Sequence, residues 1–273
     1  MSIHPTAIIE SGARIGDNCS IGPFCHIGPE VVLGDNSIVM SHVVISGATT
    51  ISEGAKIYSH AVIGGDPQNT AHKGGRTTLS VGKNCTIREG VTMNRGTDVG
   101  LGRTVVGDDC MFLAYAHVAH DCILGDRVTF ANNVMIGGHC HIGDGVIIGG
   151  GGAVHQFCRV GNNAFIGGLA GVVRDVIPYG MAIGVYAHLA GLNIVGMKRS
   201  GISRADIHAM RHAYRMLFDR SHTMHDNIAR VRDTYADAPV VMRLLDFVSV
   251  DGKRSYCTPP LDAGGAGSDD SSD

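Results

Sequence analysis

Tryptophan is absent from the 273-residue sequence and aromatic residues make up only 5% of it, so a core centred on large rings is not expected. An excess of charge of one sign is also absent, and the net charge of −3 gives no support for bulk binding of nucleic acid. No apolar run reaches the roughly 18–20 residues that span a bilayer. The first residues lack the charged-then-apolar pattern of a secretion signal, so we expect a cytoplasmic protein without a transmembrane segment.

The cysteines lack the spacing of a disulfide framework and of CxxC zinc pairs. Seven of the eight share one position of the repeat described next, and we expect them to be reduced thiols that pack as small apolar side chains. These seven are Cys19, Cys25, Cys85, Cys110, Cys122, Cys140 and Cys158.

Glycine is abundant, with 39 residues, and the chain carries an aliphatic residue at every sixth position from Ile3 to Ile63. This six-residue hydrophobic repeat, or beat, resumes at Val81 and then, one residue out of phase, runs from Val106 to Val172. In a strand the fourth and sixth residues of each unit face the same side, so six residues make one short strand and one corner. Three units close a triangular coil of about 18 residues, which predicts a parallel β-helix of hexapeptide repeats. A β-sandwich is the alternative, but it requires no such fixed spacing.

Two glycine-containing polar segments, residues 65–79 and 94–104, interrupt the beat. We expect loops that leave the coil there, either as carriers of binding residues or as plain insertions.

Beyond Val172 the pattern becomes helical. Ser203 begins one predicted helix, and Thr223 and Asp237 are predicted caps of two more, over residues 224–235 and 239–248. The predicted organisation is a β-helix over residues 1–184, a C-terminal α-helical domain over 185–257 and a disordered acidic tail over 258–273.

Residues that are 18 apart should stack in adjacent coils about 4.8 Å apart. His120 then lies against Gly138 and beside His139, and one coil further the column reaches Gln156 next to His155. The sequence therefore predicts that these polar groups share one edge of the prism. They form either a reaction site or a solvated ladder of corner residues.

Histidine is the usual general base near neutral pH, so His120 is the candidate base. Asp121 could orient the His120 ring if a corner falls between them, and the bare N–H of Gly138 could donate to an oxyanion. No comparably placed serine or cysteine nucleophile is present, which favours direct transfer over a covalent intermediate. Clustered imidazoles also bind zinc, but the spacing shows no obvious tetrahedral ligand set, so no metal is predicted.

Four motifs resemble the UDP-N-acetylglucosamine acyltransferases of lipid A synthesis: AHVAHDC (116–122), GGHCHIG (137–143), AVHQFCRVG (153–161) and GLNIVGMKRSGIS (191–203). The combination of AHDC with VHQFC is specific, and the resemblance covers roughly residues 3–250. It implies a left-handed β-helix, no cofactor, and a homotrimer with active sites between subunits. The implied reaction moves a 3-hydroxyacyl chain from acyl carrier protein to the 3-position of a UDP-sugar.

The same resemblance assigns roles to individual residues. His120 matches the general base, Asp121 its neighbour and Gly138 the oxyanion donor. Asn193 and Arg199 match contacts to the nucleotide, and Gly168 matches a position that limits acyl length. The remaining matched substrate contacts are Gln68, His117, His139, His155 and Gln156, and Asn69 stands at a further substrate-contact position.

Three positions, in two segments, depart from the family pattern. Where many members carry an aspartate and a lysine in the first loop, this chain has Asn69 and Ala71, and Ser200 replaces a second basic residue after Arg199. The lost cation beside the acceptor raises the hypothesis that a 3-amino sugar is acylated to an amide. Two further hypotheses are a zinc-dependent hydratase built on the same coil and a non-catalytic trimeric scaffold.

Overall fold

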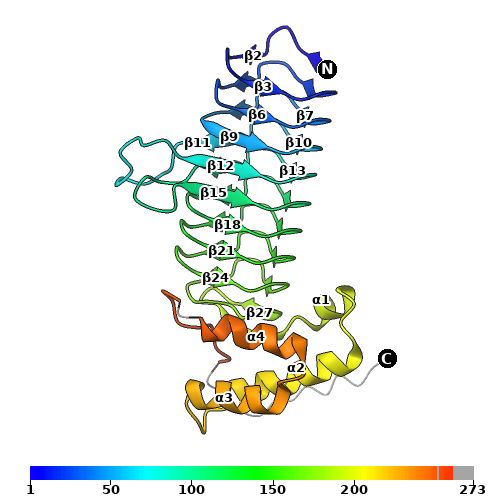
Figure 1. Ribbon diagram of the computed structural model, residues 1–273, viewed down its shortest axis with the longest axis vertical. Helices are drawn as coiled ribbons and strands as arrows, with labels where there is room; N and C mark the ends of the chain where they lie inside the picture. Colours follow the sequence, from blue (N-terminus) through cyan, green and yellow to red (C-terminus); the bar gives the residue numbers. More distant parts are fainter. Residues whose placement is uncertain (251, 261–273) are drawn as a thin grey trace.

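The computed structural model describes residues 1–250 and 252–260, which form a long three-sided prism with helices at one end (Figure 1). Successive strands go to three different sheets in turn, so strands three apart in the sequence are hydrogen-bonded neighbours. Paired residues are 18 apart in uninterrupted coils, as Ile123 is with His141. The structure confirms the predicted left-handed parallel β-helix with a C-terminal helical region.

Sheet A contains β1 (Ser2–Ile3), β4 (Ser20–Ile21), β7 (Ile38–Val39), β10 (Lys56–Ile57), β13 (Thr86–Ile87), β16 (Met111–Phe112), β19 (Thr129–Phe130), β22 (Ile147–Ile148), β25 (Phe165–Ile166), β27 (Gly180–Ile183) and β28 (His188–Leu192). Sheet B contains β2 (Ile8–Ile9), β5 (His26–Ile27), β8 (Val44–Ile45), β11 (Val62–Gly65), β14 (Thr92–Asn94), β17 (His117–Val118), β20 (Met135–Ile136), β23 (Ala153–Val154) and β26 (Gly171–Val172). Sheet C contains β3 (Arg14–Ile15), β6 (Val32–Leu33), β9 (Ala48–Ile51), β12 (Thr78–Val81), β15 (Arg103–Val106), β18 (Ile123–Leu124), β21 (His141–Ile142) and β24 (Arg159–Val160).

The second residue of most strands points into the prism and is buried, as Ile27, Ile45 and Ile63 are. The small position of the repeat fills the space near each corner. All eight cysteines are buried free thiols, which confirms their predicted packing role. Each buried aliphatic side chain contributes about 1.5–3 kcal/mol relative to exposure, so the regular column of such residues stabilises the whole coil.

Corners are made by one residue in the left-handed backbone region. Asp121, His139 and Phe157 occupy the same corner of successive coils, with φ angles of 58°, 61° and 68°. The His139 N–H donates to the His120 carbonyl at 3.0 Å, which ties neighbouring corners together. This geometry turns two consecutive side chains toward each other, which a straight strand does not allow.

Two loops leave the coil side by side (Figure 1): the first loop, residues 66–77 between β11 and β12, and the second loop, residues 95–102 between β14 and β15. Both loops were predicted, but each flanking strand extends one or two residues into the predicted segments. Asp98 joins the loops, because its carboxylate accepts from the N–H of Lys73 (3.1 Å) and of Gly75 (3.1 Å).

The C-terminal helices are α1 (Ile194–Arg199), α2 (Arg204–Leu217), α3 (Met224–Tyr235) and α4 (Pro239–Ser249). Ser203 caps α2 and Thr223 caps α3 through their side-chain oxygens, as predicted. The predicted cap Asp237 is wrong. The N-cap of α4 is Ala238, which makes no side-chain capping bond, and the helix begins with Pro239, which has no N–H to satisfy.

The predicted division at residue 184 remains a prediction. Strand β28 pairs antiparallel with β27 and continues sheet A to Leu192. Thr258, in the predicted tail, accepts from the Leu189 N–H at 3.0 Å, and residues 261–273 of that tail lie outside the described residues. Among the described residues, no helix combines the length and apolar composition that crossing a bilayer requires.

Candidate active site

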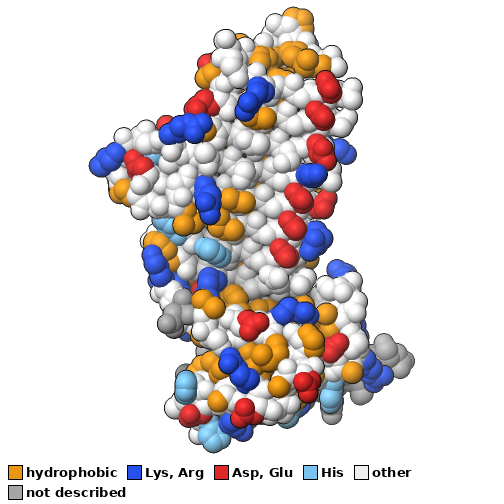
Figure 2. Space-filling model, viewed as in Figure 1, with side chains coloured by type: hydrophobic (Ala, Val, Ile, Leu, Met, Phe, Trp, Pro, Cys, Tyr) orange, Lys and Arg blue, Asp and Glu red, His pale blue; other side chains and the backbone are white. Residues whose placement is uncertain are grey.

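A cavity of about 680 Å³ opens along the face of sheet B, at its edge with sheet C. Its lining comes from successive coils, with Gln68 added by the first loop. Figure 2 shows histidine side chains (pale blue) beside hydrophobic ones (orange) on the prism, between the projecting loops and the helices. The predicted site residues His117, His120, Gly138 and His155 line this cavity, together with Gln156.

His120 and Asp121 form a dyad at the corner after β17. The left-handed backbone of Asp121 brings its Oδ2 to 2.8 Å from His120 Nδ1. The His120 residue is 7% exposed and Asp121 is fully buried. The expected orienting contact is therefore present in the structure.

The Asp121 carboxylate is held from the second loop. Thr97 donates its N–H to Oδ1 at 3.0 Å and its hydroxyl to Oδ2 at 2.6 Å, and the Gly102 N–H donates to Oδ1 at 3.1 Å. Burial raises the pKa of Asp121, but the hydrogen bonds from Thr97 and His120 outweigh it, and the pKa lies below its ordinary value. Asp121 is therefore a carboxylate at neutral pH.

The proton of the neutral His120 ring can be placed from its neighbours. A carboxylate is only an acceptor, so Nδ1 carries the proton that Asp121 accepts. On the other side, Asn69 Nδ2 lies 3.3 Å from Nε2. The Asn69 amide is oriented by the Ala71 N–H, which donates to Asn69 Oδ1 at 2.8 Å, so Asn69 presents its NH₂ group to the ring. Nε2 is thus a lone-pair acceptor, as a general base requires.

Gly138 lies directly against the His120 ring. A Cβ atom at this position would be 2.5 Å from His120 Cε1, so any side chain would displace the ring. Within the described part of the chain, no acceptor takes the Gly138 N–H.

His139, in the next coil, packs against the dyad of His120 and Asp121. Its ring packs edge-on to His120, with 5.1 Å between centroids, and stacks on Phe157 at 4.6 Å. Burial lowers the pKa of His139, so the ring is neutral at physiological pH.

The zinc hypothesis can be judged from the donor set. One donor atom from each of His120, Asp121 and His139 lies within 4.8 Å of the others. The two Asp121 oxygens, however, already accept four hydrogen bonds, from Thr97 (twice), Gly102 and His120, which fills the usual lone-pair sites. A metal would have to displace these donors, so the geometry fits an orienting carboxylate better than a metal ligand.

His117 extends the site along sheet B. Its Nδ1 lies 2.7 Å from the Thr92 hydroxyl. Burial, with a contribution from nearby His120, lowers the pKa of His117, so this ring is also neutral.

Three predicted residues lie elsewhere in this chain. Gly168 is at the corner between sheets A and B and does not line the cavity. Asn193 caps α1 and donates from Nδ2 to the carbonyl of Asn163 at 3.0 Å, at the corner between sheets C and A. Arg199 ends that same helix. A single chain therefore does not place Asn193 and Arg199 beside His120.

Several residues of the site were not predicted. Phe157 could have been found by adding 18 to His139, which is the spacing that stacks adjacent coils. Thr97 and Asp98 lie in a loop without repeat, so no register places them. Lys253 and Arg254 come from the C-terminal segment, and Lys253 Nζ lies 4.2 Å from the Phe157 ring centroid.

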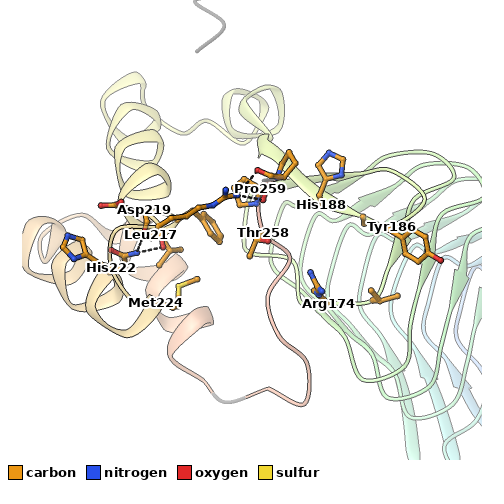
Figure 3. Close-up of a pocket in the computed structure, with 15 residues that line it drawn as sticks. Arg174, Tyr186, His188, Leu217, Asp219, His222, Met224, Thr258 and Pro259 are labelled. Atoms are coloured by element: carbon orange, nitrogen blue, oxygen red, sulfur yellow. Dashed lines mark hydrogen bonds between the residues drawn. The ribbon is translucent and has the colours of Figure 1, made fainter. Parts of the chain in front are cut away.

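A second cavity, of about 570 Å³, separates the end of the coil from the helices (Figure 3). Arg174 and His188 reach it from the coil, and His222 reaches it from the helical side. Arg220 donates to the carbonyls of residues 259–260 at 3.3 and 2.8 Å, so the end of the described chain bridges the two sides. This cavity shares only Val173 with the lining of the His120 cavity.

The coil and its corner site define a hexapeptide-repeat transferase. The family model described as bacterial transferase hexapeptide (six repeats) matches residues 12–47 and 103–138. The model described as UDP N-acetylglucosamine O-acyltransferase, domain 2, matches residues 175–257.

Comparison with individual proteins identifies one family among the hexapeptide-repeat transferases. The acyl-[acyl-carrier-protein]–UDP-N-acetylglucosamine O-acyltransferase of Brucella ovis is 60% identical over 99% of this chain and 98% of its own length. The crystal structure of UDP-N-acetylglucosamine O-acyltransferase from Moraxella catarrhalis superposes with a TM-score of 0.90 at 39% identity, covering 94% of this chain and 99% of that one. The Francisella novicida enzyme gives 0.91 at 34% identity, with 95% of each chain covered. The chain belongs to the UDP-N-acetylglucosamine O-acyltransferase family.

Proposed function

We propose that this protein transfers an acyl group from acyl carrier protein to UDP-N-acetylglucosamine, the first step of lipid A synthesis. Near-complete coverage by relatives of that name supports the reaction. The observation that carries the mechanism is the His120 dyad, in which Asp121 Oδ2 lies 2.8 Å from Nδ1 and the opposite ring nitrogen, Nε2, lies 3.3 Å from the Asn69 amide at a cavity.

In this mechanism the sugar 3-hydroxyl binds near His120 Nε2 and displaces the Asn69 amide from it. His120 takes the hydroxyl proton as the oxygen attacks the thioester carbon, and Asp121 stabilises the imidazolium that forms. The C–S bond then breaks, and the carrier thiolate leaves with the proton returned by His120. No covalent enzyme intermediate is required.

The oxyanion of the tetrahedral intermediate forms beside Gly138. The Gly138 N–H has no acceptor among the described residues and is next to the His120 ring, so it is the proposed donor to this oxygen. A donor of this kind contributes on the order of 10²–10³ in rate.

The acyl chain requires an apolar path away from the thioester. Below His117 on the outer face of sheet B, the paired residues are Met135, Ala153 and Gly171. All three line the cavity, and so does Val173. We propose that a 3-hydroxyacyl chain lies along this strip, with His117, His139, His155, Gln156 and Gln68 in contact with the sugar and donor.

We also propose that the working enzyme is a homotrimer in the cytoplasm. Asn193 and Arg199 lie at a different corner of the prism from His120, so a neighbouring copy would bring them to the diphosphate. In the same assembly, Gly168 would lie in the cleft between neighbouring copies and would limit the length of the acyl chain.

A 3-amino sugar remains the second candidate acceptor. Asn69 presents a neutral amide to His120, and Ala71 stands at the position where the family pattern has a cation near the acceptor; Lys73 of the same loop is not in register with it. A neutral amine could attack the same thioester, lose its proton to His120 and give an amide, with the same thiol as leaving group.

Paired assays with the two UDP-sugars and one acyl carrier protein donor test both candidates. Ester formation on UDP-N-acetylglucosamine confirms the proposed reaction, and a strong preference for the amino sugar would support the second candidate. Failure with both acceptors across a series of acyl lengths would contradict acyl transfer altogether.

A further inference from the structure

The C-terminal segment, residues 252–260, packs on the last coil like an added strand. Asp175 donates its N–H to the Ser255 carbonyl at 2.8 Å and accepts from the Cys257 N–H at 2.7 Å. The Arg220 contacts to residues 259–260 anchor its far end (Figure 3). Arg254 belongs to this segment and immediately precedes Ser255, the first residue whose backbone bonds to the coil. Its side chain is half-buried.

Arg254 contacts two residues that line the His120 cavity. Its Nη2 lies 2.8 Å from His155 Nδ1, and its Nε donates to the Gln156 carbonyl at 3.2 Å. A guanidinium has only donors, so the short contact requires a lone pair on His155 Nδ1. The proton of neutral His155 is then on Nε2.

The same Nδ1 atom has a competing partner. The Gln156 carbonyl lies 3.3 Å from it and would accept a proton from Nδ1 in the other tautomer. Arg254 opposes that tautomer because it donates to Nδ1, which cannot then carry a proton of its own. Its Nε also takes one of the two lone pairs of the Gln156 carbonyl. Without Arg254, the ring is free to move its proton to Nδ1 and expose an acceptor at Nε2.

We propose that Arg254 is a positioning residue that holds neutral His155 as a hydrogen-bond donor. His155 then offers its Nε2 proton to an acceptor oxygen of the substrate. The tautomer of this coil residue is therefore set by residues 252–260, the segment that follows the helices. The substrate part of this inference rests on the acyl transfer proposed above.

Arg254→Met keeps the stem of the side chain and removes all its donors. We expect a KM increase of about tenfold for the substrate that His155 contacts, with kcat nearly unchanged, since about one hydrogen bond is lost. Arg254→Lys retains a donor and should recover part of the affinity. In a His155→Ala background, Arg254→Met should add little.

Lys253→Met is the matched control, because it removes the same charge one residue away and leaves the His155 contact in place. The readout is the ¹⁵N signals of the His155 ring in ¹⁵N-histidine-labelled enzyme, assigned by their loss in His155→Ala. The protonated nitrogen should be Nε2 in the wild type and in Lys253→Met, and it should shift toward Nδ1 in Arg254→Met.

An unchanged tautomer in Arg254→Met would overturn the proposal, and so would an equal loss of affinity with and without His155. The ring measurement needs no substrate. It therefore separates a failure of this positioning from a failure of the proposed acyl transfer.

Discussion

At the scale of single residues, His120 can act as a base because its neighbours fix where its proton sits. Asp121 takes the Nδ1 proton, and Asn69 approaches Nε2 with an NH₂ group. The sequence raised the first contact on the condition that a corner falls between the two residues, and the structure has that corner at Asp121. The sequence could not predict the hydrogen bonds from Thr97 or the orientation of Asn69, because both belong to loops whose path the repeat does not define.

Asp121→Asn tests the orienting carboxylate. An asparagine can turn its NH₂ toward Nδ1 and so favour the tautomer with the proton on Nε2, which removes the base. We expect kcat to fall by about 10²–10⁴ with KM little changed, measured by steady-state acylation assays. Asp109→Asn is the control, since Asp109 is an exposed corner aspartate with a similar φ of 56°. A kcat for Asp121→Asn close to that of Asp109→Asn would contradict this role.

At the scale of elements, the hexad beat predicted the strands well. Every six-residue unit has the same requirement, namely one inward-facing aliphatic side chain followed by one corner. The antiparallel pairing of β27 with β28 and the return of residues 252–260 to the coil were not predicted. Neither segment carries the beat. Strand β28 is placed by its antiparallel pairing with the preceding strand, and residues 252–260 are placed by backbone hydrogen bonds to Asp175, which is distant in the sequence.

The two loops also act as one element, because Asp98 of the second loop binds the backbone of the first. Asp98→Ala should free the first loop, which carries Gln68 and Asn69, and raise KM for the UDP-sugar by about tenfold. Hydrogen exchange of residues 66–77 should become faster. Glu30→Ala, which breaks only the exposed ion pair with Arg76 of the same loop, should leave both values unchanged. Unaltered exchange in Asp98→Ala would contradict the bridge.

At the scale of the whole molecule, histidines with lowered pKa values make stability depend on pH. Burial lowers the pKa values of His117, His139 and His141 below the ordinary 6.5. As the pH falls through about 6.5, the unfolded chain binds protons that the folded chain does not, so stability falls until the lowered pKa values are reached.

Urea unfolding at one protein concentration should therefore give a midpoint that declines from pH 7.5 to 5.5. His117→Gln should make the decline shallower. A midpoint that stays level or rises over this range would show that the folded state tolerates these charges.

Subunit arrangement is a second whole-molecule property. If His120 of one copy works with Arg199 of the next, His120→Ala and Arg199→Ala subunits should complement each other in mixed trimers. Random mixing should restore about a quarter of the sites when the two variants are equally abundant. If the mixture stays at the level of the separate variants, the two residues do not belong to one cleft shared between copies.

The most direct test of the account is the turnover of His120→Ala with acyl carrier protein donor and UDP-N-acetylglucosamine, in protein shown by its circular dichroism and assembly to be folded as the wild type. Loss of a general base predicts that kcat falls by about 10²–10⁴ while the substrates still bind. Turnover within a few-fold of the wild type would contradict the claim that stacked coils place a histidine base at the acceptor.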